Sequence, residues 1–180
     1  MIIIVVGMPG SGKDVFVQAA LGMGFSKIGM GDVVRHFASA SGLGPGDISI
    51  GGFANSQRQE HGPVIWAART LERMPPGNVI IDGSRSLDEI SLFRERLGSG
   101  LKVVAVIAPA ETRYDRLRSR RRADDPLTRE DFDTRDGREL SWGLGRAIEA
   151  ADITVVNDTS LDDFKRRCRY VLDEMLSSNL

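Results

Sequence analysis

The sequence predicts an α/β fold in which a five-stranded parallel sheet lies between helices. Short β-branched runs recur between longer helical patterns, as in strands joined by crossover helices. Most of these runs are apolar throughout and do not alternate, which is expected of strands that helices cover on both faces. With 180 residues and 41% apolar content, the chain is the size of one domain. We therefore expect a single domain that spans residues 1–180.

The elements follow from these patterns in chain order. The expected strands are Ile2–Val6, Lys27–Met30, Asn78–Asp82, Lys102–Ile107 and Ile153–Val156. The expected helices are Lys13–Gly22, Val33–Ser41, Pro63–Arg73, Leu87–Leu97, Glu111–Arg121, Arg129–Glu149 and Leu161–Leu176. The last helix carries one apolar stripe that includes Cys168, so this cysteine is expected to be a buried packing residue.

A phosphate-binding loop stands between the first expected strand and the first expected helix. It consists of Gly7, Met8, Pro9, Gly10, Ser11, Gly12, Lys13 and Asp14. The glycines let consecutive backbone N–H groups point at phosphate oxygens, and the Lys13 side chain reaches the β and γ phosphates. We therefore predict that this loop binds ATP, with the phosphates at a helix N-terminus.

Asp14 stands where this motif asks for Ser or Thr, whose hydroxyl group normally ligates Mg²⁺. A carboxylate also binds Mg²⁺, but its negative charge repels the phosphates, so Mg²⁺ is expected to matter more here. Asp82, at the end of the third strand, is the expected second carboxylate of the metal site. The alternative is that Asp14 points away and the site binds nucleotide with little turnover.

Two segments are expected to be mobile insertions at the carboxyl edge of the sheet, where α/β proteins bind their ligands. The first, residues 41–62, contains many glycines and should lie on the acceptor side. The second, residues 118–128, should form an arginine-rich lid.

Two short motifs follow the second and third strands: Gly31-Asp32-Val33-Val34-Arg35 and Asp82-Gly83-Ser84-Arg85. They resemble motifs of adenylate kinases, in which two arginines clamp the phosphate of the acceptor nucleotide. The second spacing is one residue shorter here. The resemblance implies that Arg35 and Arg85 bind a small, nucleotide-like acceptor.

The rest of the chain resembles dephospho-CoA kinase and, more closely, a largely archaeal family of uncharacterised P-loop NTPases related to both enzymes. The residues that carry this likeness are residues 7–13, 30–35, 82–85, Asp124-Asp125-Pro126, residues 138–145, Ala151-Asp152 and residues 156–158. The resemblance implies a P-loop NTPase fold of the nucleoside monophosphate kinase type.

Asp32 has two possible roles. In dephospho-CoA kinase-like enzymes, an Asp at the corresponding place accepts the proton of an attacking ribose hydroxyl, which would make Asp32 catalytic. If the acceptor is a phosphate, no base is needed, and Asp32 would be the N-cap of the following helix. Both roles are compatible with a carboxylate that faces the cleft and contacts the acceptor.

Six arginines lie close together after the fourth strand: Arg113, Arg116, Arg118, Arg120, Arg121 and Arg122. A charge run of this kind is usually a solvated helix face. In nucleotide kinases, however, lid arginines contact the phosphates, and we expect Arg118 and Arg122 to have this catalytic role.

Asn157 follows the last strand, where related kinases place a loop against the adenine ring. The absence of a Lys after Asn157 removes the Asn-Lys-x-Asp pattern of guanine sites and favours ATP as the nucleotide. The alternative is a turn that only caps the last helix.

Composition excludes several classes of partner. A net charge of −1 predicts no general attraction to nucleic acid or to an anionic membrane, and the apolar runs are too short to span one. One cysteine excludes a disulfide framework and fits a cytoplasmic protein. No oligomeric state follows from the sequence. The chain is thus expected to be an ATP- and Mg²⁺-dependent kinase or, alternatively, an ATP-binding switch with little phosphotransfer.

Overall fold

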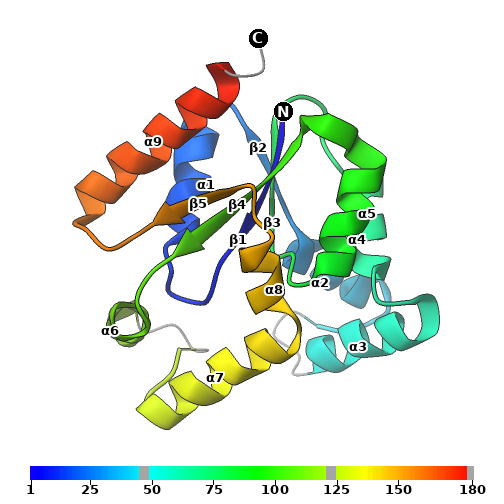
Figure 1. Cartoon of the computed structure of the whole chain (residues 1–180). Coiled ribbons are helices and arrows are strands. Elements are labelled where there is room, and N and C mark those ends of the chain that lie inside the picture. Colours follow the sequence, from blue (N-terminus) through cyan, green and yellow to red (C-terminus); the bar gives the residue numbers. More distant parts are fainter. Residues whose placement is uncertain (45–48, 121–124, 178–180) are drawn as a thin grey trace.

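The computed structural model describes residues 1–44, 49–120 and 125–177, in which a central sheet lies between two layers of helices (Figure 1). The strands are β1 (Ile2–Val6), β2 (Ser26–Gly29), β3 (Val79–Asp82), β4 (Leu101–Ile107) and β5 (Ile153–Val156). They are ordered β2-β3-β1-β4-β5 and pair in parallel throughout. The predicted five-stranded parallel sheet is therefore confirmed.

The helices connect the strands and extend beyond one edge of the sheet. They are α1 (Lys13–Gly22), α2 (Met30–Ala40), α3 (Ser49–His61), α4 (Ile65–Glu72), α5 (Leu87–Leu97), α6 (Ala110–Arg120), α7 (Arg129–Ser141), α8 (Leu144–Glu149) and α9 (Leu161–Ser177), with a short 3-10 helix at Gly98–Gly100. Figure 1 shows α1 and α9 on one side of the sheet and α2, α4, α5 and α8 on the other. No helix in the described ranges is long and apolar enough to cross a membrane.

The apolar strands divide the core into two clusters. Because successive side chains of a strand point to opposite faces, Ile3 and Val5 pack with α1 and α9, whereas Ile4 and Val6 pack against the other helix layer. Cys168 is fully buried in the first cluster, as predicted. A strand that is buried on both faces must be apolar throughout, which explains the unbroken run in β1.

The register of the strands aligns the segments that carry the site. Asp82 at the end of β3 lies beside Val5 of β1 on one side and Gly29 of β2 on the other. The chain after each of these strands therefore leaves the sheet at the same edge. Helices α3, α6 and α7 lie beyond this edge (Figure 1).

Within the segment 41–62, which is predicted to be a mobile insertion, residues 49–61 form helix α3. Glycines disfavour a helix locally, but tertiary packing overrides this local preference. Phe53 lies against the ring of Trp66, and the Trp66 Nε1–H donates a hydrogen bond to the carbonyl of Ala54 at 3.1 Å. Residues 45–48 lie outside the described residues.

The single helix predicted over residues 129–149 is also wrong, because Gly143 divides it into α7 and α8. Gly143 has φ of 96°, a left-handed conformation that ends α7 and begins α8. Helix α2 begins at Met30 instead of Val33, and its N-cap is Gly29. The predicted N-cap role of Asp32 is therefore wrong, because Asp32 lies inside the first turn.

Replacing Gly143 with Ala should destabilise the protein by about 1–2 kcal/mol, because a Cβ atom is strained in the left-handed conformation. Gly137→Ala in the middle of α7 is the matched control: a Cβ there meets open space, so this change should stabilise the protein by about 0.5–1 kcal/mol. Urea unfolding of the two variants measures both effects. Equal stability changes would contradict the assignment of Gly143 as the break between the helices.

Candidate active site

The phosphate-binding loop is held from behind by a buried side chain, Asn157. Its Nδ2–H donates a hydrogen bond to the carbonyl of Ser11 at 2.8 Å. Gly12 lies directly against this amide, since a Cβ atom at Gly12 would be 2.2 Å from Asn157 Nδ2, and its φ of 104° also favours glycine. Asn157 is only 4% exposed and is absent from the wall of the cavity described below. It therefore supports the loop from the end of β5, and its predicted contact with adenine stays a prediction.

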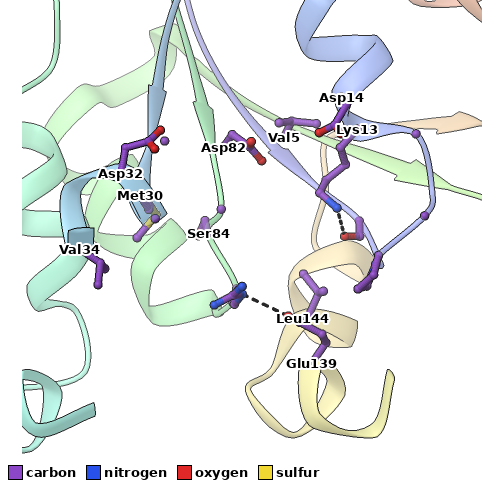
Figure 2. A pocket seen from close by; sticks show the side chains of 18 of the residues that line it. Val5, Lys13, Asp14, Met30, Asp32, Val34, Asp82, Ser84, Glu139 and Leu144 are labelled. Carbon is purple, nitrogen blue, oxygen red and sulfur yellow. Dashed lines mark hydrogen bonds and ion pairs between the residues drawn. The ribbon is translucent and has the colours of Figure 1, made fainter. Parts of the chain in front are cut away.

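Lys13 is folded back onto the loop that precedes it. Its Nζ donates hydrogen bonds to the carbonyls of Gly7 at 2.6 Å and Met8 at 3.3 Å (Figure 2). Burial lowers the pKa of Lys13, while the negative charges of Asp82 and Asp14 oppose this shift. A half-buried ammonium group that donates to backbone carbonyls is well placed to exchange them for phosphate oxygens, which carry full negative charge.

A cavity of about 620 Å³ opens at the carboxyl edge of the sheet, in front of the loop. It brings together most of the predicted site residues: Gly7, Pro9, Gly10, Gly12, Lys13, Asp14, Asp32, Arg35, Asp82 and Arg85. Figure 2 shows side chains from the loop, from α2, from the end of β3 and from α7 around it. Met8 and Ser11 are not in its wall, and Arg122 lies outside the described residues.

Only some of the described arginines of α6 reach the cavity. Arg118 lies over the ring of Tyr114, 5.5 Å from its centre, and is absent from the cavity wall. The wall contains Arg116 and Arg120 from α6, together with Arg135 from α7. The face of α6 that carries Arg116 and Arg120 is the one directed at the loop. A charge run alone does not reveal which helix face meets the loop, and Arg135 lies outside the run altogether.

Arg116 links helix α6 to the support of the loop. Its Nη2 donates to the Oδ1 and carbonyl oxygens of Asn157, at 3.1 and 3.4 Å. Its buried Nη1 has no hydrogen-bond partner in the part of the chain that the structure describes. Burial lowers the pKa of Arg116. A guanidinium with unused donors beside the loop is suited to an anion in the cavity.

On the side of the cavity opposite the phosphate-binding loop, the wall contains Asp32 and Arg35 of α2 (Figure 2). Their side chains form an ion pair on the first turns of α2, with 2.5 Å between Asp32 Oδ1 and Arg35 Nη2. Both side chains are more than half exposed, at 65% and 59%. An exposed pair of this kind contributes little to stability, so either partner can rearrange to meet a ligand.

Arg85 is held more firmly than Arg35. Its Nε lies 3.1 Å from Glu139 Oε2, a carboxylate of α7 that is only 8% exposed, and its guanidinium lies over the ring of Trp142. Figure 2 marks this ion pair. Separating the pair would leave a buried carboxylate without its partner, which is costly. Glu139 was not predicted, because nothing local in α7 indicates which of its acidic residues turns inward.

Glu89 is a second buried carboxylate that was not predicted. It lies in the first turn of α5, where the side chain of Ser86 caps the helix by accepting from the Glu89 N–H. Glu89 Oε2 accepts hydrogen bonds from Ser84 Oγ at 3.2 Å and from the Arg85 N–H at 2.8 Å. The Ser86-x-x-Glu89 spacing is a sequence signal for this helix start, although it does not indicate that the carboxylate lines a cavity.

The two predicted metal residues, Asp14 and Asp82, both border the cavity. Asp82 also forms an ion pair with Lys27 of the neighbouring strand, with 3.2 Å between Nζ and Oδ2. Within the described ranges, no cluster of three or more His, Cys, Asp or Glu residues could hold a metal ion by itself. Oxygen ligands suit Mg²⁺, which usually takes one or two carboxylates together with phosphates and water. The residues therefore fit a Mg²⁺ ion that arrives with a nucleotide.

Comparison with known proteins identifies the family. The family described as AAA domain matches residues 3–136. UPF0200 protein Ta0179 of Thermoplasma acidophilum is 43% identical over 176 residues, which are 97% of each chain. A UPF0200 protein of Hyperthermus butylicus is 41% identical over 178 residues, 97% of this chain and 95% of that one. The chain belongs to the UPF0200 family and to the AAA domain family.

Solved structures extend the likeness to kinases. TT1252 from Thermus thermophilus aligns with a TM-score of 0.64 at 19% identity, over 97% of both chains. Dephospho-CoA kinase from Campylobacter jejuni aligns with a TM-score of 0.59 at 18% identity, over 99% of this chain and 98% of that one. Shikimate kinase from Acinetobacter baumannii gives 0.58 at 19% identity, over 99% and 94%. These likenesses confirm the predicted P-loop kinase fold and support nucleotide binding in general.

Burial of Glu89 gives a prediction for stability. Burial raises the pKa of Glu89 above its ordinary 4.5, against the opposing effects of the Arg85 N–H, Arg58 and Ser84. Because the folded protein then binds the proton more tightly than the unfolded chain, this group adds stability as the pH falls through the raised pKa towards 4.5. The free energy of unfolding of the wild type, minus that of Glu89→Gln, should rise over this window by about 1.4 kcal/mol per pKa unit.

Urea unfolding at a series of pH values measures this difference, since the other carboxylates are common to both proteins and cancel. If this difference stays constant or falls as the pH falls, folding does not raise the pKa of Glu89 and the prediction is wrong.

Proposed function

We propose that the chain is a kinase that transfers the γ phosphate of ATP to a small nucleotide or nucleoside-containing acceptor, with Mg²⁺. The observation that carries this proposal is the shared cavity, which borders the phosphate-binding loop on one side and α2 and the end of β3 on the other. A phosphate-binding protein needs only the first half, whereas phosphoryl transfer needs a donor and an acceptor in line within one cleft.

The donor half would bind ATP through the loop N–H groups and Lys13. Arg116 of α6 is the cation best placed to stabilise charge on the phosphates, since its Nη1 has no partner in the described residues. Arg120 of the same face is a second candidate, although its guanidinium is paired with the buried carboxylate of Asp125. Lys13 is also influenced by charges of the acceptor half, since Asp82, Glu139 and Arg85 all affect its pKa. The two halves are therefore close enough to interact electrostatically.

Asp14 and Asp82 would hold the metal or its water ligands. Mg²⁺, when bound, neutralises charge on the β and γ phosphates and orients them. Asp14 brings a carboxylate to the position of the usual hydroxyl and keeps a negative charge near the phosphates in the absence of the ion.

In the acceptor half, Asp32 is a candidate base and Arg35 is a candidate anion contact. For a hydroxyl acceptor, its oxygen attacks the γ phosphorus, the bond between the γ phosphorus and the bridging oxygen breaks, ADP leaves, and the hydroxyl proton passes to Asp32. For a phosphate acceptor, Arg35 would bind the anion and no base is required. Dephospho-CoA kinase and shikimate kinase, two proteins with this fold, are kinases by name, which supports the reaction type.

Lys13→Ala should lower acceptor-dependent turnover at least about 100-fold, because the lysine is expected to contact the transferred phosphate. The measurement is ADP release in the presence of ATP, Mg²⁺ and a panel of nucleosides, nucleoside monophosphates and dephospho-CoA, with products identified by mass. Lys165→Ala, on the outer surface of α9, is the matched control and should leave turnover unchanged. Full turnover in Lys13→Ala, or no acceptor-dependent product in the wild type, would refute the proposal.

The second candidate is an ATP-dependent switch with little phosphotransfer. Asp14 favours it, because a carboxylate beside the phosphates disfavours nucleotide binding whenever Mg²⁺ is low. Nucleotide occupancy would then report on Mg²⁺ and ATP together and could order segments near the cleft. Acceptor-dependent ADP release counts against this candidate.

Asp14→Ser should make ATP binding less dependent on Mg²⁺, since it removes a negative charge close to the phosphates. Titration calorimetry with Mg²⁺ and with EDTA gives the ratio of the two affinities for each protein. We expect this ratio to be at least about tenfold larger in the wild type than in Asp14→Ser, or about 1.4 kcal/mol. Equal ratios would mean that Asp14 points away from the phosphates.

A further inference from the structure

Glu89 is a buried carboxylate in the wall of the cavity that the proposed reaction does not use. The residue is 4% exposed and borders the cavity between the end of β3 and α5. The Glu89 carboxylate accepts hydrogen bonds from Ser84 Oγ and from the Arg85 N–H, and both bonds go to the same oxygen, Oε2. Within the described ranges, Oε1 accepts no hydrogen bond, and it is not among the fully enclosed polar atoms without a partner. One oxygen of a buried carboxylate therefore faces the cavity.

No cation of the acceptor half is paired with this oxygen. Arg85 bonds Glu89 only through its backbone N–H, while its guanidinium is held by Glu139. Arg58 of α3 also borders the cavity and interacts with Glu89 electrostatically, yet its Nη1 donates to Asn55 at 3.1 Å and no ion pair with Glu89 forms in the described residues. A buried carboxylate oxygen without a donor is costly, so a ligand that supplies one gains affinity.

The surrounding charges indicate what kind of donor fits. Three cations of this half are already neutralised by carboxylates in the cavity wall: Lys27 by Asp82, Arg35 by Asp32 and Arg85 by Glu139. Glu89 adds a negative charge on the same side, which Arg58 of the same wall opposes without forming an ion pair with it in the described residues. A group with its own negative charge would be repelled at Glu89, whereas neutral O–H or N–H donors satisfy Oε1 without disturbing the three ion pairs.

We propose that Glu89 selects the acceptor by accepting hydrogen bonds from neutral O–H or N–H donors through Oε1. The inference rests on the proposed function, since it concerns the acceptor half of the same cleft. Two parts of a nucleoside supply such donors: the sugar hydroxyls and the amino edge of a base. Glu89 thus acts as a specificity-determining residue for the sugar or base of the acceptor and does not contact phosphate.

Equilibrium binding of nucleosides tests this inference. The protein is saturated with Mg²⁺ and a non-hydrolysable ATP analogue and titrated with adenosine, guanosine, cytidine, uridine and inosine, and with the dideoxy forms of those that bind. At least one nucleoside should bind the wild type and bind Glu89→Gln at least about tenfold more weakly, as expected for a lost hydrogen bond to a charged group. Affinity for the ATP analogue should be equal in both proteins.

Asp88→Asn is the matched control. Asp88 precedes Glu89 in the first turn of α5 and is exposed, so the variant removes the same charge from the same helix end outside the cavity. It should bind nucleosides as the wild type does. Binding of no nucleoside to the wild type, or binding that Glu89→Gln leaves unchanged, would overturn the inference.

The panel also distinguishes the two sources of donors and a purely structural role. If a base amine is recognised, Gln at position 89 offers its own N–H to the cavity, so the preference for cytidine over uridine, or for adenosine over inosine, should fall at least about tenfold. If sugar hydroxyls are recognised, the dideoxy forms should lose binding in the wild type only. A purely structural role would weaken all compounds and the ATP analogue alike, and this outcome refutes the inference.

The inference about Glu89 and the phosphotransfer proposal can be refuted independently of each other. Glu89-dependent nucleoside binding without acceptor-dependent ADP release would refute the phosphotransfer proposal and leave the inference standing. ADP release with an acceptor that binds the wild type and Glu89→Gln equally well would support the phosphotransfer proposal and refute the inference.

Discussion

The hydrogen bond from Asn157 to the carbonyl of Ser11 is the contact on which the site depends. It joins the end of β5 to the loop after β1, across 146 positions of sequence, and it is buried. Because Gly12 has no side chain, the amide can reach the loop backbone, and the same amide's oxygen accepts a bond from Arg116. The shape of the loop, the position of Lys13 at the start of α1 and the placement of α6 thus all depend on the Asn157 side chain.

The two halves of the cleft are built on different electrostatic terms. On the donor side, the ammonium of Lys13 donates to backbone carbonyls, and the Arg116 guanidinium donates to Asn157 and keeps one Nη without a partner in the described residues. An anion can therefore bind to both cations. On the acceptor side, cations and carboxylates alternate and pair within the wall. Positive charge is thus available where a triphosphate would bind, whereas it is balanced by carboxylates where an acceptor would lie. This difference favours the triphosphate on the donor side, even if the acceptor also carries phosphate.

Much of the fold could be predicted because it depends on local pattern. The apolar run of β1 and the glycine-rich loop after it can be predicted without knowing which distant residues they contact. Both lie where they were expected. The roles of Asn157, Glu139 and Glu89 could not be predicted in this way, since each is decided by which distant element packs against it. Helix α3 formed despite its glycines because Trp66 offered a packing partner, and Arg118 missed the cavity because α6 turns its other face inward.

The buried position of Cys168 has a practical consequence. It is the only cysteine of the chain and lies on the inner face of α9 among apolar side chains, and burial raises the pKa of its thiol to about 12. Thiolate, the reactive form towards oxidants and alkylating reagents, is therefore scarce at neutral pH. A second cysteine introduced on the surface of α3 or α6 would be the reactive thiol of the folded protein, so spectroscopic labels could follow movement of these helices while the native cysteine is retained.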